Sequence, residues 1–161
     1  MMKSASSNEI KAALHNLSPK EIVQICLRIS KYKRENKELL SYLLYEADNE
    51  QQYIDNIKTE IDAYFNNLVV LNFSNMLKKL RKVVRLANKY IKFSGSKNVE
   101  VAVLIHICYH LLPFTKQNSS TALLNLYNRQ IIKIDKALSK LEEDLQYDYK
   151  NDISAIQIPV L

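Results

Sequence analysis

The sequence predicts an all-α protein of about seven helices, joined as antiparallel helical hairpins, with a long helix near the C-terminus. The 161 residues include only one Gly and three Pro, whereas β-hairpins need Gly at turns with positive φ. Apolar residues recur at intervals of 3 and 4 through most of the chain, which is typical of amphipathic helices. Short polar clusters separate these stretches. The hairpins could stack as a HEAT-like array or close into a helical bundle, and we favour the array.

The length and composition predict one domain over residues 1–150, followed by a C-terminal tail at 151–161. The hydrophobic content of 47% and the charged content of 25% are ordinary for a globular chain. The first ten residues lack the apolar core of a signal peptide, and the longest apolar run, Val101–Leu112, is too short to span a bilayer of about 30 Å. We interpret Cys26 and Cys108 as two buried thiols that form no disulfide. We therefore expect a cytoplasmic protein without a membrane segment.

Three short helices are predicted in the N-terminal part, over residues 9–16, 19–33 and 37–47. Ser18, Pro19 and Glu21 form a clear start for the second helix, with Ser18 as N-cap and Glu21 closing a capping box. We expect Asn36 to cap the third helix. The second helix is expected to bury Ile22, Ile25, Cys26 and Ile29.

The fourth helix, over about residues 51–71, carries apolar residues at a regular spacing of 3 and 4. The region around its start is acidic. The sixth helix, over about residues 98–112, is apolar nearly all round, and such a helix must be surrounded by others. We expect it to be the centre of the core and to end at Pro113.

The fifth helix concentrates the charge of the chain, because residues 76–97 hold eight Lys or Arg and no acid. Without these eight, 15 basic residues stand against 17 acidic ones, so the net charge of +6 lies in this segment. At 100° per residue its apolar residues fall on one side and its cations on the other. We expect the helix to end at Gly95. The candidate anion-binding residues are Lys78, Arg81, Lys82, Arg85, Lys89 and Lys92.

This basic face has three interpretations: a solvated surface balanced by the acidic fourth helix, a nucleic-acid backbone site, or a membrane contact. The membrane interpretation is disfavoured because the apolar side is committed to the core and lacks Trp or Phe anchors. Sequence-specific reading is disfavoured because the face is mostly Lys, with no Asn or Gln pair beside its two Arg. Contact with nucleic-acid backbone, without sequence specificity, is the prediction we prefer.

The last helix, predicted over residues 120–148, carries three heptads of apolar residues, the minimum for a coiled-coil seam. It could be appended to the domain or form a homodimer. The residues expected at such an interface are Leu124, Ile131, Ile134, Leu138 and Leu141.

The sequence lacks the motifs of several enzyme classes. One Gly is too few for a P-loop, a dinucleotide fingerprint or a nucleophile elbow. His106 and His110 are four residues apart, as in the two-His half of a zinc site. A third ligand is not evident, although Glu100, Cys26 or His15 could supply one. Core histidines are the better interpretation, and we expect no metal, cofactor or catalytic residue.

Three stretches together carry a resemblance to known proteins: residues 17–21, ISKYKRENKELLSYLLYEAD at 29–48, and RKVVRLANKYIKFSGSKNVE at 81–100. This pattern resembles a family of small, all-helical, functionally uncharacterised bacterial proteins, mostly from the Bacteroidetes. The resemblance covers about residues 14–112. It implies a helical fold and a bacterial cytosolic protein, and it implies no catalytic residues.

These observations favour a non-enzymatic helical interaction domain that binds an anionic macromolecule, nucleic acid before acidic protein, through the basic helix. The alternative is a protein–protein adaptor or homodimer that uses the heptad helix. A metal-dependent enzyme built on His106 and His110 comes third.

Overall fold

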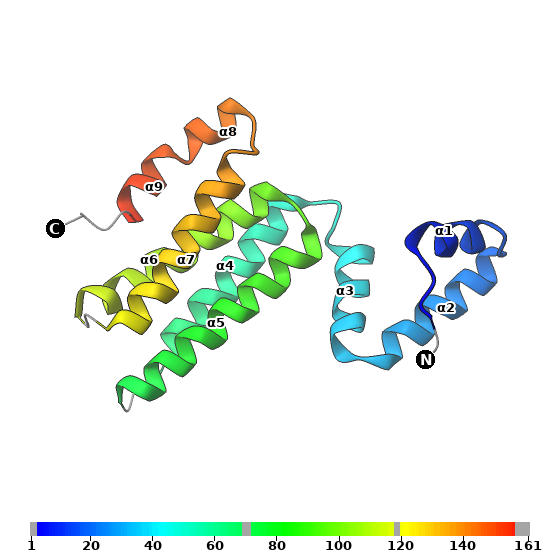
Figure 1. Cartoon of the computed structure of the whole chain (residues 1–161), viewed down its shortest axis with the longest axis horizontal. Coiled ribbons are helices and arrows are strands. Elements are labelled where there is room, and N and C mark those ends of the chain that lie inside the picture. The colour runs from blue at the N-terminus through cyan, green and yellow to red at the C-terminus, as the bar shows by residue number, and fades with distance from the viewer. Residues whose placement is uncertain (1–2, 69–71, 118–119, 157–161) are drawn as a thin grey trace. The chain divides into compact units, whose positions relative to one another are not determined.

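The computed structural model describes residues 3–68, 72–117 and 120–156, and these residues form nine α-helices and no strand (Figure 1). The predicted all-α class is confirmed. The helices are α1 (Ser7–His15), α2 (Pro19–Tyr32), α3 (Arg34–Tyr45), α4 (Glu50–Asn66), α5 (Phe73–Ser94), α6 (Lys97–Gln117), α7 (Thr121–Leu138), α8 (Glu143–Asp148) and α9 (Lys150–Ile156).

The chain divides into two compact units, residues 1–45 and 46–161, where we expected a single domain over residues 1–150. The first unit contains α1 to α3, in which α2 packs on α3. The second contains α4 to α9, in which α6 contacts α4, α5, α7 and α9. The division follows from the packing, because the apolar sides of the later helices are directed at α6 and those of α2 and α3 at each other.

The start of the first unit agrees with the predicted capping. Ser18 accepts a hydrogen bond from the Glu21 amide, and the Glu21 carboxylate accepts one from the Ser18 amide, which completes the capping box. The predicted third helix starts earlier than expected, at Arg34, because the Asn36 side chain donates to the Ile29 carbonyl instead of capping. The predicted burial of α2 was wrong: Ile25 is 37% exposed and Ile29 is 54% exposed.

The second unit is built around α6, as its nearly uniform apolar composition predicts. Ten of its residues are buried, from Val99 to Thr115, and they point in every direction around the helix. By length and composition alone α6 could cross a membrane, but 56% of its most apolar window is buried among the other helices. Buried core helices commonly pass the same test, and the packing accounts for this one. Cys108 belongs to this core, and burial raises the pKa of its thiol to about 12.

Tyrosine hydroxyls set the register of α4 against α5. Tyr53 donates to the Tyr90 carbonyl at 3.1 Å, and Tyr64 donates to the Lys79 carbonyl at 2.9 Å. Since the later residue of α4 meets the earlier residue of α5, the two helices are antiparallel. Contacts between α4 and α6 instead run in the same order along both helices, so this pair is parallel. Figure 1 shows α4, α5, α6 and α7 side by side.

Pro113 does not end α6, which continues to Gln117. A proline inside a helix removes one amide donor and leaves the carbonyl four residues earlier without its partner. That residue is Tyr109, and Tyr109 and Pro113 are both exposed. Water can therefore satisfy the Tyr109 carbonyl, and the helix tolerates the proline on its outer side.

The single long helix predicted over residues 120–148 is instead two helices, α7 and α8, and a third helix, α9, follows within the predicted tail. A continuous helix would be about 43 Å long, whereas α6 is about 32 Å long, so its end would project beyond its partner. The chain turns after Leu138 and folds back, which buries Ile156 and lets the Tyr127 hydroxyl donate to the Ile156 carbonyl. The predicted tail is thus helical up to Ile156, and residues 157–161 lie outside the described residues.

The C-terminal end of α5 lies where the sequence predicted it, whereas that of α4 comes earlier. The fifth helix ends as expected at Gly95, the C-cap, which adopts a left-handed conformation with φ of 67°. The fourth helix ends at Asn66 rather than near Leu71, because Asn67 caps it with backbone and side-chain hydrogen bonds to the Ala63 carbonyl. Residues 69–71 lie outside the described residues.

Replacing Ile105 by Ala should lower the free energy of unfolding by about 2–5 kcal/mol, because this side chain is 3% exposed at the centre of α6. Urea denaturation followed by circular dichroism measures the change. Ile132→Ala on α7 is the matched control. Ile132 is 65% exposed, so this substitution should change the free energy of unfolding by no more than about 0.5 kcal/mol. A cost below about 1 kcal/mol at Ile105 would contradict a core centred on α6.

Replacing Gly95 by Ala should cost about 1 kcal/mol, because an L-residue is strained at this left-handed C-cap. A new Cβ atom would meet no atom within 4 Å, so a steric clash does not contribute. Gly95→Asn should cost less, since Asn tolerates the left-handed region better. Thermal unfolding of the three proteins tests this order, and equal stability would mean that the turn adopts another conformation.

Candidate functional site

The predicted basic face lies on α5 and is directed away from the core. The apolar side of α5 is buried from Met76 to Ile91, as the helical periodicity requires. Lys78, Arg81, Lys82, Arg85 and Lys92 are exposed. In the part of the chain that the structure describes, none of these five forms an ion pair within 4.0 Å of a carboxylate.

The acidic residues of α4 are engaged with polar groups other than these cations. Glu60 accepts a hydrogen bond from the Tyr90 hydroxyl at 3.0 Å. Glu50 accepts one from the Asn98 amide at 2.7 Å, and Asp55 accepts one from Gln51 at 3.0 Å. The interpretation in which the acidic helix neutralises the basic face is therefore unsupported for the five exposed cations.

Lys79 and Lys89 have surroundings that differ from those of the other cations on α5. The Lys89 ammonium lies 4.9 Å from the centre of the Tyr90 ring and 5.9 Å from that of Phe93, within the range of cation–π contacts. Both lysines are half-buried. Of the six predicted anion-binding residues, Lys89 is thus the one whose ammonium group already contacts aromatic rings of its own helix.

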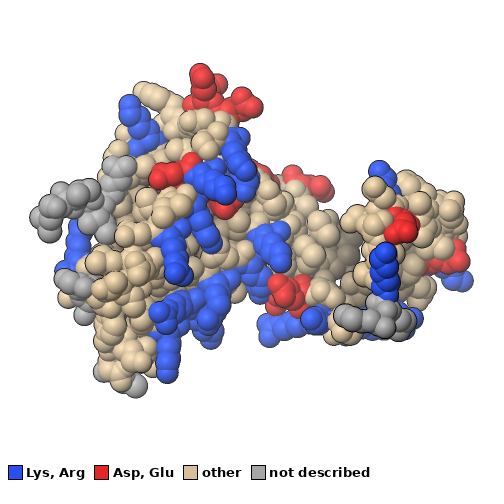
Figure 2. All heavy atoms as spheres, in the orientation of Figure 1, with Lys and Arg blue, Asp and Glu red and all other residues tan. Residues whose placement is uncertain are grey.

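A second set of cations, on α7, extends the basic surface. Arg129, Lys133 and Lys136 recur at intervals of 4 and 3, which places them on one side of the helix, and all three are exposed. The Lys133 ammonium donates to the Asn88 side-chain oxygen of α5 at 2.7 Å. Figure 2 shows Lys and Arg side chains over α5 and α7, and acidic side chains at the end formed by α8.

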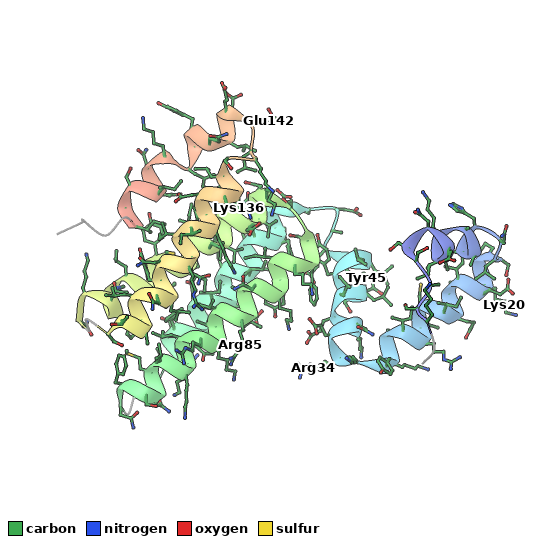
Figure 3. All side chains as sticks on the ribbon, viewed as in Figure 1. Lys20, Arg34, Tyr45, Arg85, Lys136 and Glu142 are labelled. Carbon is green, nitrogen blue, oxygen red and sulfur yellow. The ribbon has the colours of Figure 1, made fainter. Side chains whose placement is uncertain are left out.

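The Asn88–Lys133 hydrogen bond brings the two rows of cations side by side. Arg81, Arg85 and Lys92 lie within one or two turns of Asn88 and within about 60° of it around the helix. On α7, Asp135 is two residues from Lys133 and so points to the opposite edge. Figure 3 locates Arg85 on α5 and Lys136 on α7. We call the six residues Arg81, Arg85, Lys92, Arg129, Lys133 and Lys136 the basic surface.

Sequence reasoning missed the contribution of α7, because over the predicted helix at 120–148 four Lys or Arg stand against five Asp or Glu, which leaves no excess of positive charge. Its apolar residues were assigned to a dimer seam instead. In the structure Ile134 is buried against the rest of its own chain, and Leu124, Ile131, Leu138 and Leu141 are half-buried. Homodimerisation stays a prediction, which the mass in solution would test.

The two histidines of α6 meet a carboxylate that the sequence did not reveal. His106 Nε2 lies 2.6 Å from Asp62 Oδ1, and His110 Nε2 lies 2.7 Å from the same oxygen. Asp62 comes from α4, which runs parallel to α6. The His110 ring stacks on the Phe65 ring with 4.4 Å between centres and an interplanar angle of 7°. One turn of α4 thus supplies both the acceptor and the stacking partner.

The three groups influence one another's charge. Burial is the largest influence on the Asp62 carboxyl and raises its pKa, but hydrogen bonds from His110 and His106 and their charges outweigh it. The pKa of Asp62 therefore lies below its ordinary value. For His106, burial lowers the pKa and outweighs the opposing effect of Asp62, with smaller contributions from His110 and Lys58.

The sequence suggested Glu100, Cys26 or His15 as a third partner for these histidines. Glu100 is paired with Lys97 on its own helix, and Cys26 and His15 belong to the first unit. Asp62 was not among the ligands expected from the sequence. Periodicity places it on the polar side of α4, but only the register of α4 against α6 brings it to the histidines.

No family model, curated protein or solved structure matches the chain.

Proposed function

We propose that the protein binds nucleic acid through phosphate contacts, without sequence specificity, at the basic surface of α5 and α7. The observation that carries the proposal is the Asn88–Lys133 hydrogen bond, which joins two rows of exposed cations into one surface. Three cations on one side of a single helix would be unremarkable. Two adjacent rows spread the cations over an area, both along the helices and across them, and such an area can contact a polyanion that lies across both helices.

The dimensions of the surface suit several phosphates. Arg81 and Lys92 are eleven residues apart, or about 16 Å along α5. Along one strand of B-form DNA the phosphates follow at about 3.4 Å of axial rise, so this length covers about five of them. Arg129 and Lys136 span about 10 Å of α7 beside it. The surface therefore fits a short segment of backbone rather than a single phosphate.

The chemistry of the surface supports backbone contact over reading of bases. Specific readout of guanine or adenine uses bidentate Arg, Asn or Gln side chains. Asn88 is the amide closest to the arginines by register, and it is engaged with Lys133. The remaining groups are three ammonium and three guanidinium groups, which attract phosphate irrespective of sequence.

Fluorescence anisotropy with duplex DNA, single-stranded DNA and RNA should detect binding that weakens at least about tenfold between roughly 50 and 200 mM salt, because phosphate contacts release counterions. Arg85→Glu with Lys92→Glu should abolish or strongly reduce this binding. The matched control is Lys11→Glu with Lys20→Glu in the first unit, which changes the net charge equally, from +6 to +2. Equal loss in both variants would mean that net charge, and not this surface, governs binding.

Arg129→Glu with Lys133→Glu on α7 should weaken binding as well, although α7 lies outside the basic segment of the sequence. The slope of log K against log salt should become shallower by roughly 0.9 for each duplex phosphate contact removed. If this variant keeps the wild-type affinity and the wild-type salt dependence, α7 does not contact the nucleic acid, and the binding surface is limited to α5. If the wild-type protein binds no nucleic acid even at low salt, the function proposed here is wrong.

A further inference from the structure

We propose that Asp62, His106 and His110 form a binding site for a divalent first-row transition-metal ion, with Zn²⁺ as the ion they fit best. The inference is independent of nucleic-acid binding, since none of the three residues belongs to the basic surface. It rests on the convergence of three ligand atoms from two helices, on the packing that orients them, and on their access to solvent.

The ligand atoms converge on one point. Asp62, His106 and His110 each offer one ligand atom, and these three atoms all lie within 4.8 Å of one another. A metal bound at about 2.0–2.2 Å places neighbouring ligand atoms about 2.8–3.5 Å apart. The two contacts of Asp62, at 2.6 and 2.7 Å, are slightly shorter than this. Binding of an ion would lengthen these two contacts by a few tenths of an ångström and would hold the two imidazole nitrogens within the same range of each other.

The donor set points to a borderline metal rather than to Mg²⁺ or Ca²⁺. Imidazole nitrogen suits zinc, iron, copper and nickel, whereas magnesium and calcium prefer an all-oxygen environment. Two histidines with one carboxylate are the ligands of several catalytic zinc sites and of non-haem iron sites, in which further positions are left for water or substrate. The two histidines have the four-residue spacing that brings both rings to one face of a helix.

The surrounding structure holds the ligands in place. His110 is stacked on Phe65, and the two imidazole rings meet edge to face with 5.0 Å between centres. The three side chains remain accessible, with exposed fractions of 45% for Asp62, 22% for His106 and 28% for His110. An ion can therefore reach the site without unfolding. Lys58, whose charge acts on His106, opposes a cation, while the Asp62 carboxylate favours one.

The proposal differs in its consequences from a purely structural hydrogen-bonded cluster. For one carboxylate oxygen to accept from both histidines, each must carry its hydrogen on Nε2. A metal replaces those hydrogens at Nε2, and a neutral ring then carries its hydrogen on Nδ1. Glutamine can donate to Asp62 as histidine does, but it lacks the ring nitrogen. His→Gln variants therefore separate the two roles.

The experiment is titration of the full-length chain, first stripped of metal with a chelator, with Zn²⁺ by isothermal calorimetry. We expect one ion per chain, and a rise in the thermal midpoint in the presence of Zn²⁺. Asp62→Asn and the pair His106→Gln with His110→Gln should each reduce the affinity for Zn²⁺ at least about tenfold. Loss of a residue that only hydrogen-bonds to a metal ligand already lowers metal affinity by about this factor, and these changes remove the ligands themselves. Circular dichroism without metal verifies that the variants are folded.

Asp55→Asn on the same helix, His15→Ala and Cys26→Ser are the matched controls and should retain wild-type affinity. Co²⁺ should give visible absorption bands that are lost in the same variants as Zn²⁺ binding, and Mg²⁺ or Ca²⁺ should not compete. Absence of stoichiometric binding in the wild type would overturn the proposal. So would Zn²⁺ binding that survives Asp62→Asn and both His→Gln changes, or that disappears with His15→Ala or Cys26→Ser. Tighter anaerobic binding of Fe²⁺ at the same residues would support the site but reassign its preferred ion.

Discussion

The burial of most of the surface of α6 is the constraint on which the second unit depends. A helix that is apolar nearly all round can be stable in water only if other helices cover most of its apolar surface. Four helices, α4, α5, α7 and α9, contact it, and each contributes its own apolar side. The fold-back after Leu138 belongs to the same constraint, because it returns Ile156 to the core rather than extending α7 past the end of α6.

The few polar side chains of α6 add specificity to this packing. Asn98 donates to Glu50, and its oxygen accepts a hydrogen bond from the Tyr149 hydroxyl at 2.7 Å. His106 and His110 meet Asp62 further along the same pair of helices. Each of these hydrogen bonds contributes about 0.5–1.5 kcal/mol and would not form in another register, so together they favour the observed register of α4 on α6. The contacts that set the register are therefore also the ones that bring three metal-ligating atoms together.

The basic surface has a comparable origin. Because the apolar side of α5 is committed to the core, its cations are directed outward. Packing of both α5 and α7 on α6 then brings their neighbouring edges close enough for Lys133 to reach Asn88. Like charges on two adjacent helices repel one another and contribute nothing to folding, and a bound polyanion would relieve that repulsion. The proposed binding of nucleic acid depends on these two adjacent rows of cations.

Local sequence patterns were sufficient to predict the helical class, through the single Gly and the apolar spacing, and also the capping box at Ser18, the end of α5 at Gly95 and the central place of α6. These features depend on neighbouring residues or on the overall character of one helix. Three features became visible only in the packed helices: Asp62 meets the two histidines, Lys133 lies beside Asn88, and the heptad helix ends at Leu138. Each of these depends on the register and length of one helix against another. Helical periodicity shows which side of a helix is polar, but it carries no information about how far that helix slides along its partner.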